Sequence, residues 1–145
     1  IMGDTTVIDV PADPAEVTIR LAGVHVVERW GFELSGQRYI DCLGSENPWE
    51  QSRQAIAAAH QPCAMRTLRQ VFRKNTNVAS RVELCFLPVH DDRRDRPELF
   101  VVGAADTLPA SVQPRHEPIM GCRDLDVAFL DIGFGVPPDA AGTPT

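Results

Sequence analysis

The chain has 145 residues, 43% of them hydrophobic and 23% charged, which is the balance of a soluble globular protein. This length suits one domain with a tail and excludes two domains of ordinary size. The net charge of −6 repels a phosphate backbone, and no apolar run approaches the roughly 20 residues of a membrane span, so we expect neither nucleic-acid nor membrane partners.

The first third of the chain predicts a hairpin followed by a short helix. Residues 7–10 form a β-branched run, and residues 17–21 alternate between apolar and polar side chains, as in a half-buried strand. Helical spacing begins after Gly23, and Gly31 ends it, so residues 24–30 are predicted to form a helix held between two permissive glycines.

The segment "ENPWEQSRQAIAAAHQP" predicts the long helix of the chain, over residues 47–61. Asn47 suits the cap, Pro48 the first helical position and Glu50 a capping box, and Pro62 ends the helix. Its buried stripe is predicted to comprise Trp49, Ser52, Ile56 and Ala59.

Three strands are predicted after this helix. The period changes at Cys63, residues 81–87 alternate, and a charged tip, "HDDRRDRP", separates them from the apolar run "ELFVVGAA". One face of the middle strand is expected to carry Val82, Leu84 and Phe86. The predicted order is therefore strand, strand, helix, helix, strand, strand, strand.

Proline content rises after Pro109, which divides the chain into three parts. We expect a domain over residues 5–109, an extension over residues 110–137 that docks on it through "VAFLDIGFG", and a disordered tail over residues 138–145. Because the chain starts abruptly at Ile1, we expect it to be part of a longer protein.

The stretch "TIRLAGVHVVERWGFELSGQRYIDCL" resembles the entry of the bacterial single-PAS family, whose signature is "RlaGt.l...fG.eltG". Eight positions match this signature: Arg20, Leu21, Ala22, Gly23, Gly31, Glu33, Leu34 and Gly36. "VELCFLPVHDD" with "LFVVGAA" resembles the last two strands of the family, with a longer turn here, and "FLDIGFGVP" resembles its closing motif. The resemblance covers residues 5–137.

The resemblance implies a PAS fold, with a five-stranded antiparallel sheet and helices packed on one face. It also implies a non-catalytic module of bacterial signalling that forms a homodimer and binds a small ligand, a protein partner or an output domain. The expected pocket is lined by Trp30, Tyr39, Trp49, Ile56, Phe86 and Phe100.

The alternative function is a cofactor sensor. In haem-binding PAS domains the axial histidine lies on the long helix, and His60 lies near the end of the corresponding helix here. A histidine at a helix C-terminus is also stabilised simply by the helix dipole, and we expect that structural role and no bound cofactor.

The residue spacing argues against a metal site, a cysteine nucleophile and an acid/base pair. His60 and Cys63, with Cys42, resemble metal ligands, but Pro62 breaks their register. Four cysteines without a C-x-x-C pair indicate reduced thiols, as expected in the cytoplasm, and no partner spacing makes Cys63 or Cys85 a nucleophile. An enzyme with a similar layout would need an acid/base pair in its cavity, which the predicted inward faces lack.

Two charged clusters and one glycine pair also have plain structural interpretations. Asp91, Asp92 and Asp95 alternate with arginines, which argues against a calcium loop, and "GFG" at 133–135 is expected to be a turn. A basic cluster is expected to be a solvated face rather than a binding patch, and it comprises Arg66, Arg69, Arg73 and Lys74.

Overall fold

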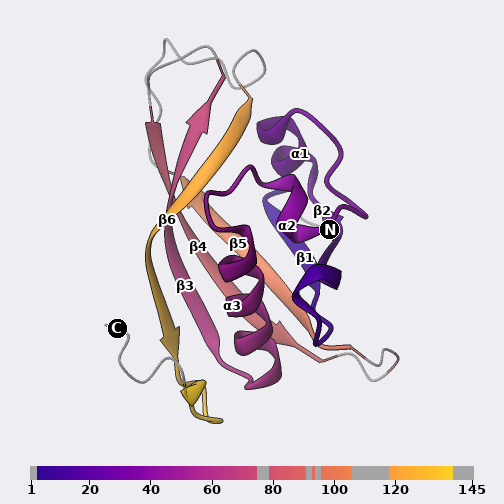
Figure 1. Ribbon diagram of the computed structural model, residues 1–145, viewed down its shortest axis with the longest axis vertical. Coiled ribbons are helices and arrows are strands. Elements are labelled where there is room, and N and C mark those ends of the chain that lie inside the picture. The colour runs from indigo at the N-terminus through magenta and orange to yellow at the C-terminus, as the bar shows by residue number, and fades with distance from the viewer. Residues whose placement is uncertain (1–2, 75–78, 91–92, 94–95, 106–117, 139–145) are drawn as a thin grey trace.

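The computed structural model describes residues 3–74, 79–90, 93, 96–105 and 118–138. These residues form one antiparallel sheet of six strands in the order β2-β1-β5-β4-β3-β6 (Figure 1). The α+β class is confirmed, whereas the expected number of five strands is wrong because β6 adds a sixth. The strands are β1 (Thr5–Asp9), β2 (Thr18–Ala22), β3 (Ala64–Arg73), β4 (Ala79–Val89), β5 (Glu98–Ala105) and β6 (Ile119–Leu130).

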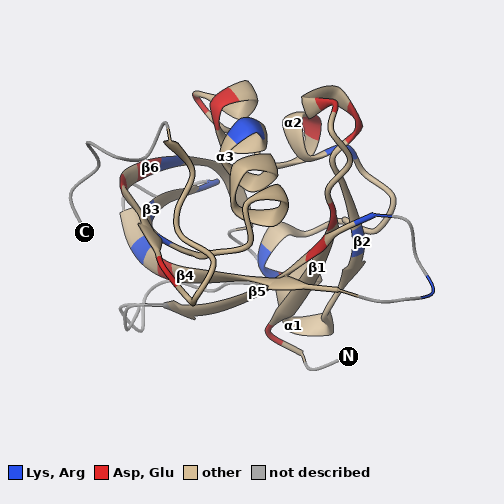
Figure 2. Cartoon of the chain, turned by 90° about the horizontal axis from the view of Figure 1, so that it is seen from below, with Lys and Arg blue, Asp and Glu red and all other residues tan. Residues whose placement is uncertain are grey.

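The helical elements lie between the second and third strands of the chain, except for one short turn. They are α1 (Val24–Trp30), α2 (Tyr39–Cys42) and α3 (Pro48–His60), while the 3-10 turn η1 (Pro14–Glu16) joins β1 to β2. Figure 2 shows α2 and α3 side by side over the sheet, and α3 contacts α2, β4 and β5. In the described part of the chain, none of the helices has the length and apolar character needed to span a bilayer.

The long helix lies within one residue of its predicted bounds at each end, but its buried face is different. Trp49 is 46% exposed, so the predicted stripe through it is wrong. Small and polar side chains instead face the sheet, which lets the helix backbone approach the strands closely. The buried residues of α3 are Gln51, Ser52, Ala55, Ala58 and Ala59. Asn47 occupies the cap position, but its side chain makes no capping hydrogen bond.

β3 and β4 follow the alternation of buried and exposed side chains expected of strands covered on one face. In β4, Phe86 is buried while Arg81 and Glu83 are exposed. In β3 the buried positions recur every second residue and include two arginines, Arg69 and Arg73, which are 6% and 5% exposed. The expectation that this basic cluster forms a solvated face is therefore wrong for these two residues.

β6 runs along β3 for the whole length of that strand. The pairing extends from Ile119 opposite Arg73 to Leu130 opposite Ala64. Residues 119–130, expected to lie in an extension docked on the domain, therefore form an edge strand of the sheet itself. Residues 139–145, within the expected tail, lie outside the described residues.

The loop before α3 passes so close to β6 that only glycine fits there. Gly44 has φ +58°, and a Cβ on it would lie 2.3 Å from the carbonyl oxygen of Met120. Gly36 also has a positive φ, +85°, but a Cβ there meets no atom within 4 Å. We expect Gly44→Ala to lower the free energy of unfolding by about 2 to 3 kcal/mol, because a steric clash adds to the backbone strain.

Gly36→Ala is the matched control, because it introduces the left-handed strain alone and should cost only about 1 kcal/mol. Urea denaturation of both variants measures the difference. Equal losses in the two variants would show that the close approach of Gly44 to β6 has no energetic weight.

Candidate functional site

A cavity of about 100 Å³ lies between the sheet and the helices. Its walls are mainly apolar and come from strands at the centre of the sheet, with Phe86 of β4 buried at 1% exposure. The aliphatic side chains around Phe86 are Ile8, Ile19, Val71, Val82, Leu84 and Val101. An apolar cavity with a few polar groups has the composition of a small-molecule site.

α1 forms one wall of this cavity through Val26, Arg29 and Trp30. Its first turn is held to the N-terminal segment, since the backbone amides of His25 and Val26 donate to the carbonyl oxygen of Gly3 at 3.0 and 3.3 Å. The N-terminal end of the helix is thereby fixed to the strand β1 that follows this segment.

The two glycines that flank α1 differ in conformation. Gly31 has φ +81° and its amide donates to the carbonyl of Val27, the geometry of a left-handed helix cap. Gly23 has φ −66°, which any residue can adopt, and its amide donates to Thr5 of β1 at 2.9 Å. The expectation of two permissive points is therefore wrong at Gly23, and Gly31 is the end at which the backbone requires glycine.

Asp4 and Arg29 form an ion pair beside the same cavity, and His25 lies 3.5 Å from Asp4. Slight burial would raise the pKa of Asp4, but the hydrogen bond and charge of Arg29 hold it below its ordinary value. These side chains are largely exposed, so the pair contributes little to stability. The ion pair links α1, through Arg29, to the N-terminal segment, through Asp4.

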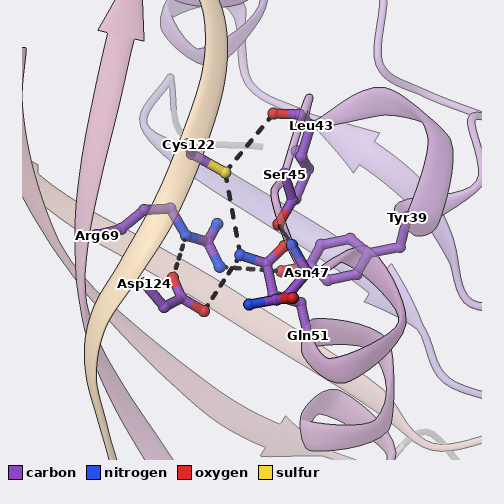
Figure 3. A network of polar contacts seen from close by, with 8 residues as sticks. All are labelled: Tyr39, Leu43, Ser45, Asn47, Gln51, Arg69, Cys122 and Asp124. Atoms are coloured by element: carbon purple, nitrogen blue, oxygen red, sulfur yellow. Dashed lines mark hydrogen bonds and ion pairs between the residues drawn. The ribbon is translucent and has the colours of Figure 1, made fainter.

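The opposite wall of the cavity carries a buried polar network (Figure 3). The Nε of Arg69 donates to Asp124 at 2.8 Å, and its Nη2 donates to the hydroxyl of Tyr39 at 3.5 Å. Gln51 of α3 also donates to Asp124, at 3.2 Å. Three elements, α2, α3 and β6, therefore meet at the ion pair of Arg69 and Asp124.

Burial and neighbouring groups shift the pKa of Arg69 in opposite directions. Desolvation would lower the pKa of Arg69, but Tyr39, Asp124 and Cys122 raise it above its usual range, so the guanidinium stays charged. Burial raises the pKa of Tyr39, so its hydroxyl remains protonated. The site thus presents hydrogen-bond donors at neutral pH.

Two further groups surround the network. The thiol of Cys122 donates to the carbonyl of Leu43 at 3.6 Å, which ties β6 to the segment after α2. The Oε1 atom of Gln51 is buried without a hydrogen-bond partner among the described residues. Burying such an oxygen without a partner costs free energy of folding. The hydrogen bond from the amide nitrogen of Gln51 to Asp124 offsets part of this cost.

The residues predicted to line a pocket fall into two groups. Trp30, Tyr39 and Phe86 line the cavity. Trp49, Ile56 and Phe100 lie outside its lining: Trp49 is exposed, Ile56 packs partly buried on the core, and Phe100 alternates with the cavity residue Val101 and so faces the other side of β5.

His60 lies at the surface end of α3, away from the cavity lining. Its Nε2 is 2.8 Å from the carbonyl oxygen of Val10, so the ring joins the helix end to the segment after β1. This geometry is that of a structural histidine, and it gives the haem alternative no support.

Sequence reasoning missed Arg69, Asp124 and Gln51. A usable signal was present in β3, because Arg69 falls in the same alternating phase as Met65 and Val71. An arginine in the apolar phase of a strand predicts a buried partner. Nothing in the sequence indicates that the partner comes from residue 124, because β6 was not predicted as a strand.

The remaining candidate sites are structural where the structure describes them. Within the described residues no group of three or more His, Cys, Asp or Glu side chains is arranged to hold a metal. Gly133 and Gly135 form a turn whose amides donate to Asp131 at 2.7 and 3.0 Å. Asp91, Asp92 and Asp95 lie outside the described residues.

All four cysteines are free, and three of them are buried. Burial raises the pKa of Cys42 to about 11, and also raises the pKa of Cys63 and Cys122. The thiolate is the reactive form, so these three should react slowly near neutral pH.

We expect iodoacetamide to label Cys85 first, because its side chain is the only half-buried one of the four. Peptide mass spectrometry over a time course measures the order, and the same reaction in guanidinium chloride should label all four at similar rates. Labelling of Cys42 or Cys122 as fast as Cys85 in the folded protein would contradict the burial assigned to them.

Comparison of the chain with protein-family models, with curated proteins and with solved structures finds no match.

Proposed function

We propose that the chain is a non-catalytic sensory module of the PAS type, which binds a small ligand in the cavity between α1, α2 and the sheet. The observation that carries the proposal is the cavity itself, with apolar walls and a buried Arg69 and Tyr39 on one side. The matched signature from Arg20 to Gly36 supports the PAS assignment, since it spans β2, α1 and the loop that leads to α2.

Signalling is proposed to occur by movement of α1. The N-terminal end of α1 is fixed to the N-terminal segment and β1. Its C-terminal end is at Gly31, which has a positive φ, and the helix would rotate about this residue. A ligand that touches Val26 and Trp30 would bias the position of α1 only to the extent that it binds one arrangement better. The shift would pass through β1 to the sheet.

The receiving partner is proposed to be a second copy of the chain or an output domain, in a cytoplasmic signalling protein. A row of registered apolar side chains crosses the sheet on the face opposite Phe86, and it comprises Leu21, Val7, Phe100 and Leu87. Val7 is buried and Phe100 half-buried within the chain, so the outer two residues offer the exposed area. Leu21 and Leu87 are 40% and 41% exposed. Ile132 and Phe134 after β6 are also exposed and provide a second apolar surface.

Sedimentation of the wild type and of Leu87→Glu tests the dimer. We expect the wild type to be a dimer and Leu87→Glu to be a monomer. A monomer at all concentrations, or a dimer indifferent to both Leu87→Glu and Phe134→Glu, would remove the homodimer from the proposal.

Xenon is a suitable first probe for the cavity, because apolar cavities of similar size bind it. We expect NMR amide shifts under xenon pressure to be confined to residues around the cavity and α1. The double variant Val71→Leu/Val101→Leu should abolish them by filling the space, whereas Val102→Leu, on the opposite face of β5, should leave them unchanged. Absence of shifts in the wild type would contradict a ligand-binding function.

A further inference from the structure

We infer that the ligand of this cavity is a small, neutral molecule with one oxygen acceptor, such as a ketone, ester or amide. The inference rests on the proposed function, because it concerns the chemical class of the molecule that the cavity binds. Its basis is the set of donors, the charge balance and the size of the cavity.

The cavity wall formed by Arg69 and Tyr39 offers donors rather than acceptors. The hydrogen bonds of Arg69 to described residues use Nε and Nη2, which leaves Nη1 without a partner among them. The hydroxyl of Tyr39 accepts from Arg69, so its own proton remains available for donation. Both residues line the cavity. A ligand complementary to two donors presents an oxygen acceptor.

The other polar lining residues do not change this requirement. Asp4 and Arg29 pair with each other beside α1, and Thr6 contributes a neutral hydroxyl. The remaining walls are apolar, so the rest of the ligand should be hydrocarbon.

The charge balance favours a neutral ligand over a carboxylate. Asp124 lies 2.8 Å from Arg69 and is itself largely buried, with its side chain 14% exposed. It already compensates the guanidinium, so a buried carboxylate ligand would be desolvated without a free cation to pair with it. A cationic ligand would meet the donors of Arg69 and Tyr39 and is excluded more strongly.

The size of the cavity restricts the ligand to a few heavy atoms. At about 100 Å³ it is smaller than the roughly 150 Å³ of an apolar cavity that accommodates benzene. A five-membered ring is therefore at the upper end of what fits.

Rings with five or six heavy atoms test the class of ligand at nearly constant size. Cyclopentanone carries the acceptor, cyclopentane lacks it, and cyclopentylamine and cyclopropanecarboxylate carry opposite charges. Dissociation constants come from NMR titration of the wild-type protein. We expect cyclopentanone to bind at least about tenfold more tightly than the other three, the gain of one hydrogen bond to a buried donor.

Tyr39→Phe separates the hydrogen bond from the shape of the cavity. It removes one hydroxyl and leaves the contact of Arg69 with Asp124 in place. Cyclopentanone should bind the variant about tenfold more weakly, while cyclopentane should bind it as it binds the wild type.

Each other outcome has a distinct meaning. Equal binding of cyclopentanone and cyclopentane overturns the ligand class and leaves a ligand-binding cavity. Tighter binding of the carboxylate or the amine overturns the neutral assignment. Binding of none of the four rings, together with absent xenon shifts, overturns the proposed function itself.

Discussion

Phe86→Ala should lower the free energy of unfolding by about 3 to 5 kcal/mol, the cost of removing a large side chain from a packed core. Phe86 is 1% exposed, pairs across to Met65 in β3 and lines the cavity. Truncation removes its transfer free energy and also enlarges the existing cavity, which the surrounding side chains cannot fill. Urea denaturation followed by circular dichroism measures the loss.

Phe100→Ala is the matched control, since Phe100 is the same residue type on the other face of the adjacent strand and is only half-buried. Its loss should be clearly smaller. If the two truncations cost the same, the assignment of the helix-covered face to Phe86 would be wrong.

Asp124→Asn should also cost about 3 to 5 kcal/mol, because it leaves the charge of Arg69 buried without a counter-charge. The side chains of Arg69 and Asp124 are 7% and 14% exposed, so neither is well screened by solvent. The loss should therefore persist at high salt, unlike that of a surface pair. Denaturation at low and high sodium chloride tests both statements.

The double variant Arg69→Met/Asp124→Leu separates the worth of the pair from the penalty of breaking it. We expect it to be close to the wild type in stability, because well-packed apolar residues often replace a buried ion pair at little cost. A cost below about 1 kcal/mol for Asp124→Asn, the value of a surface pair, would show that Arg69 is solvated.

Local periodicity was sufficient to predict most of the fold. α1 lies between Gly23 and Gly31, and α3 lies between Asn47 and Pro62, and the structure confirms the positions predicted from these residues. β4 carries Val82, Leu84 and Phe86 at alternate positions, which correctly placed Phe86 inside. These features depend on neighbours close in the sequence, which explains why they could be predicted.

The predictions for β6 and for the buried face of α3 were wrong, because both features depend on residues distant in the sequence. β6 has a mixed pattern, interrupted by the bulges in its pairing with β3, so its alternation was not recognised as a strand. The buried face of α3 was misplaced because Trp49 was taken as core, whereas Ala55, Ala58 and Ala59 face the sheet. Hydrophobicity alone does not show that a close helix-to-sheet contact selects small residues.

The residues of the candidate site also divide into those with a local sequence signal and those that meet only through strand pairing. Trp30, Tyr39 and Phe86 were predicted from the helix and strand patterns that contain them. Arg69 and Asp124 are 55 residues apart and meet only through the pairing of β3 with β6. Their contact could not be predicted without that pairing.

Filling the cavity is expected to alter α1 and the sheet that it contacts. Hydrogen exchange followed by mass spectrometry, with and without saturating cyclopentanone, measures this response. Protection should change over residues 23–45 and at the sheet surface, and the Val71→Leu/Val101→Leu variant should show no such response. Unchanged exchange in both places, with cyclopentanone shown to be bound by NMR, would contradict the mechanism.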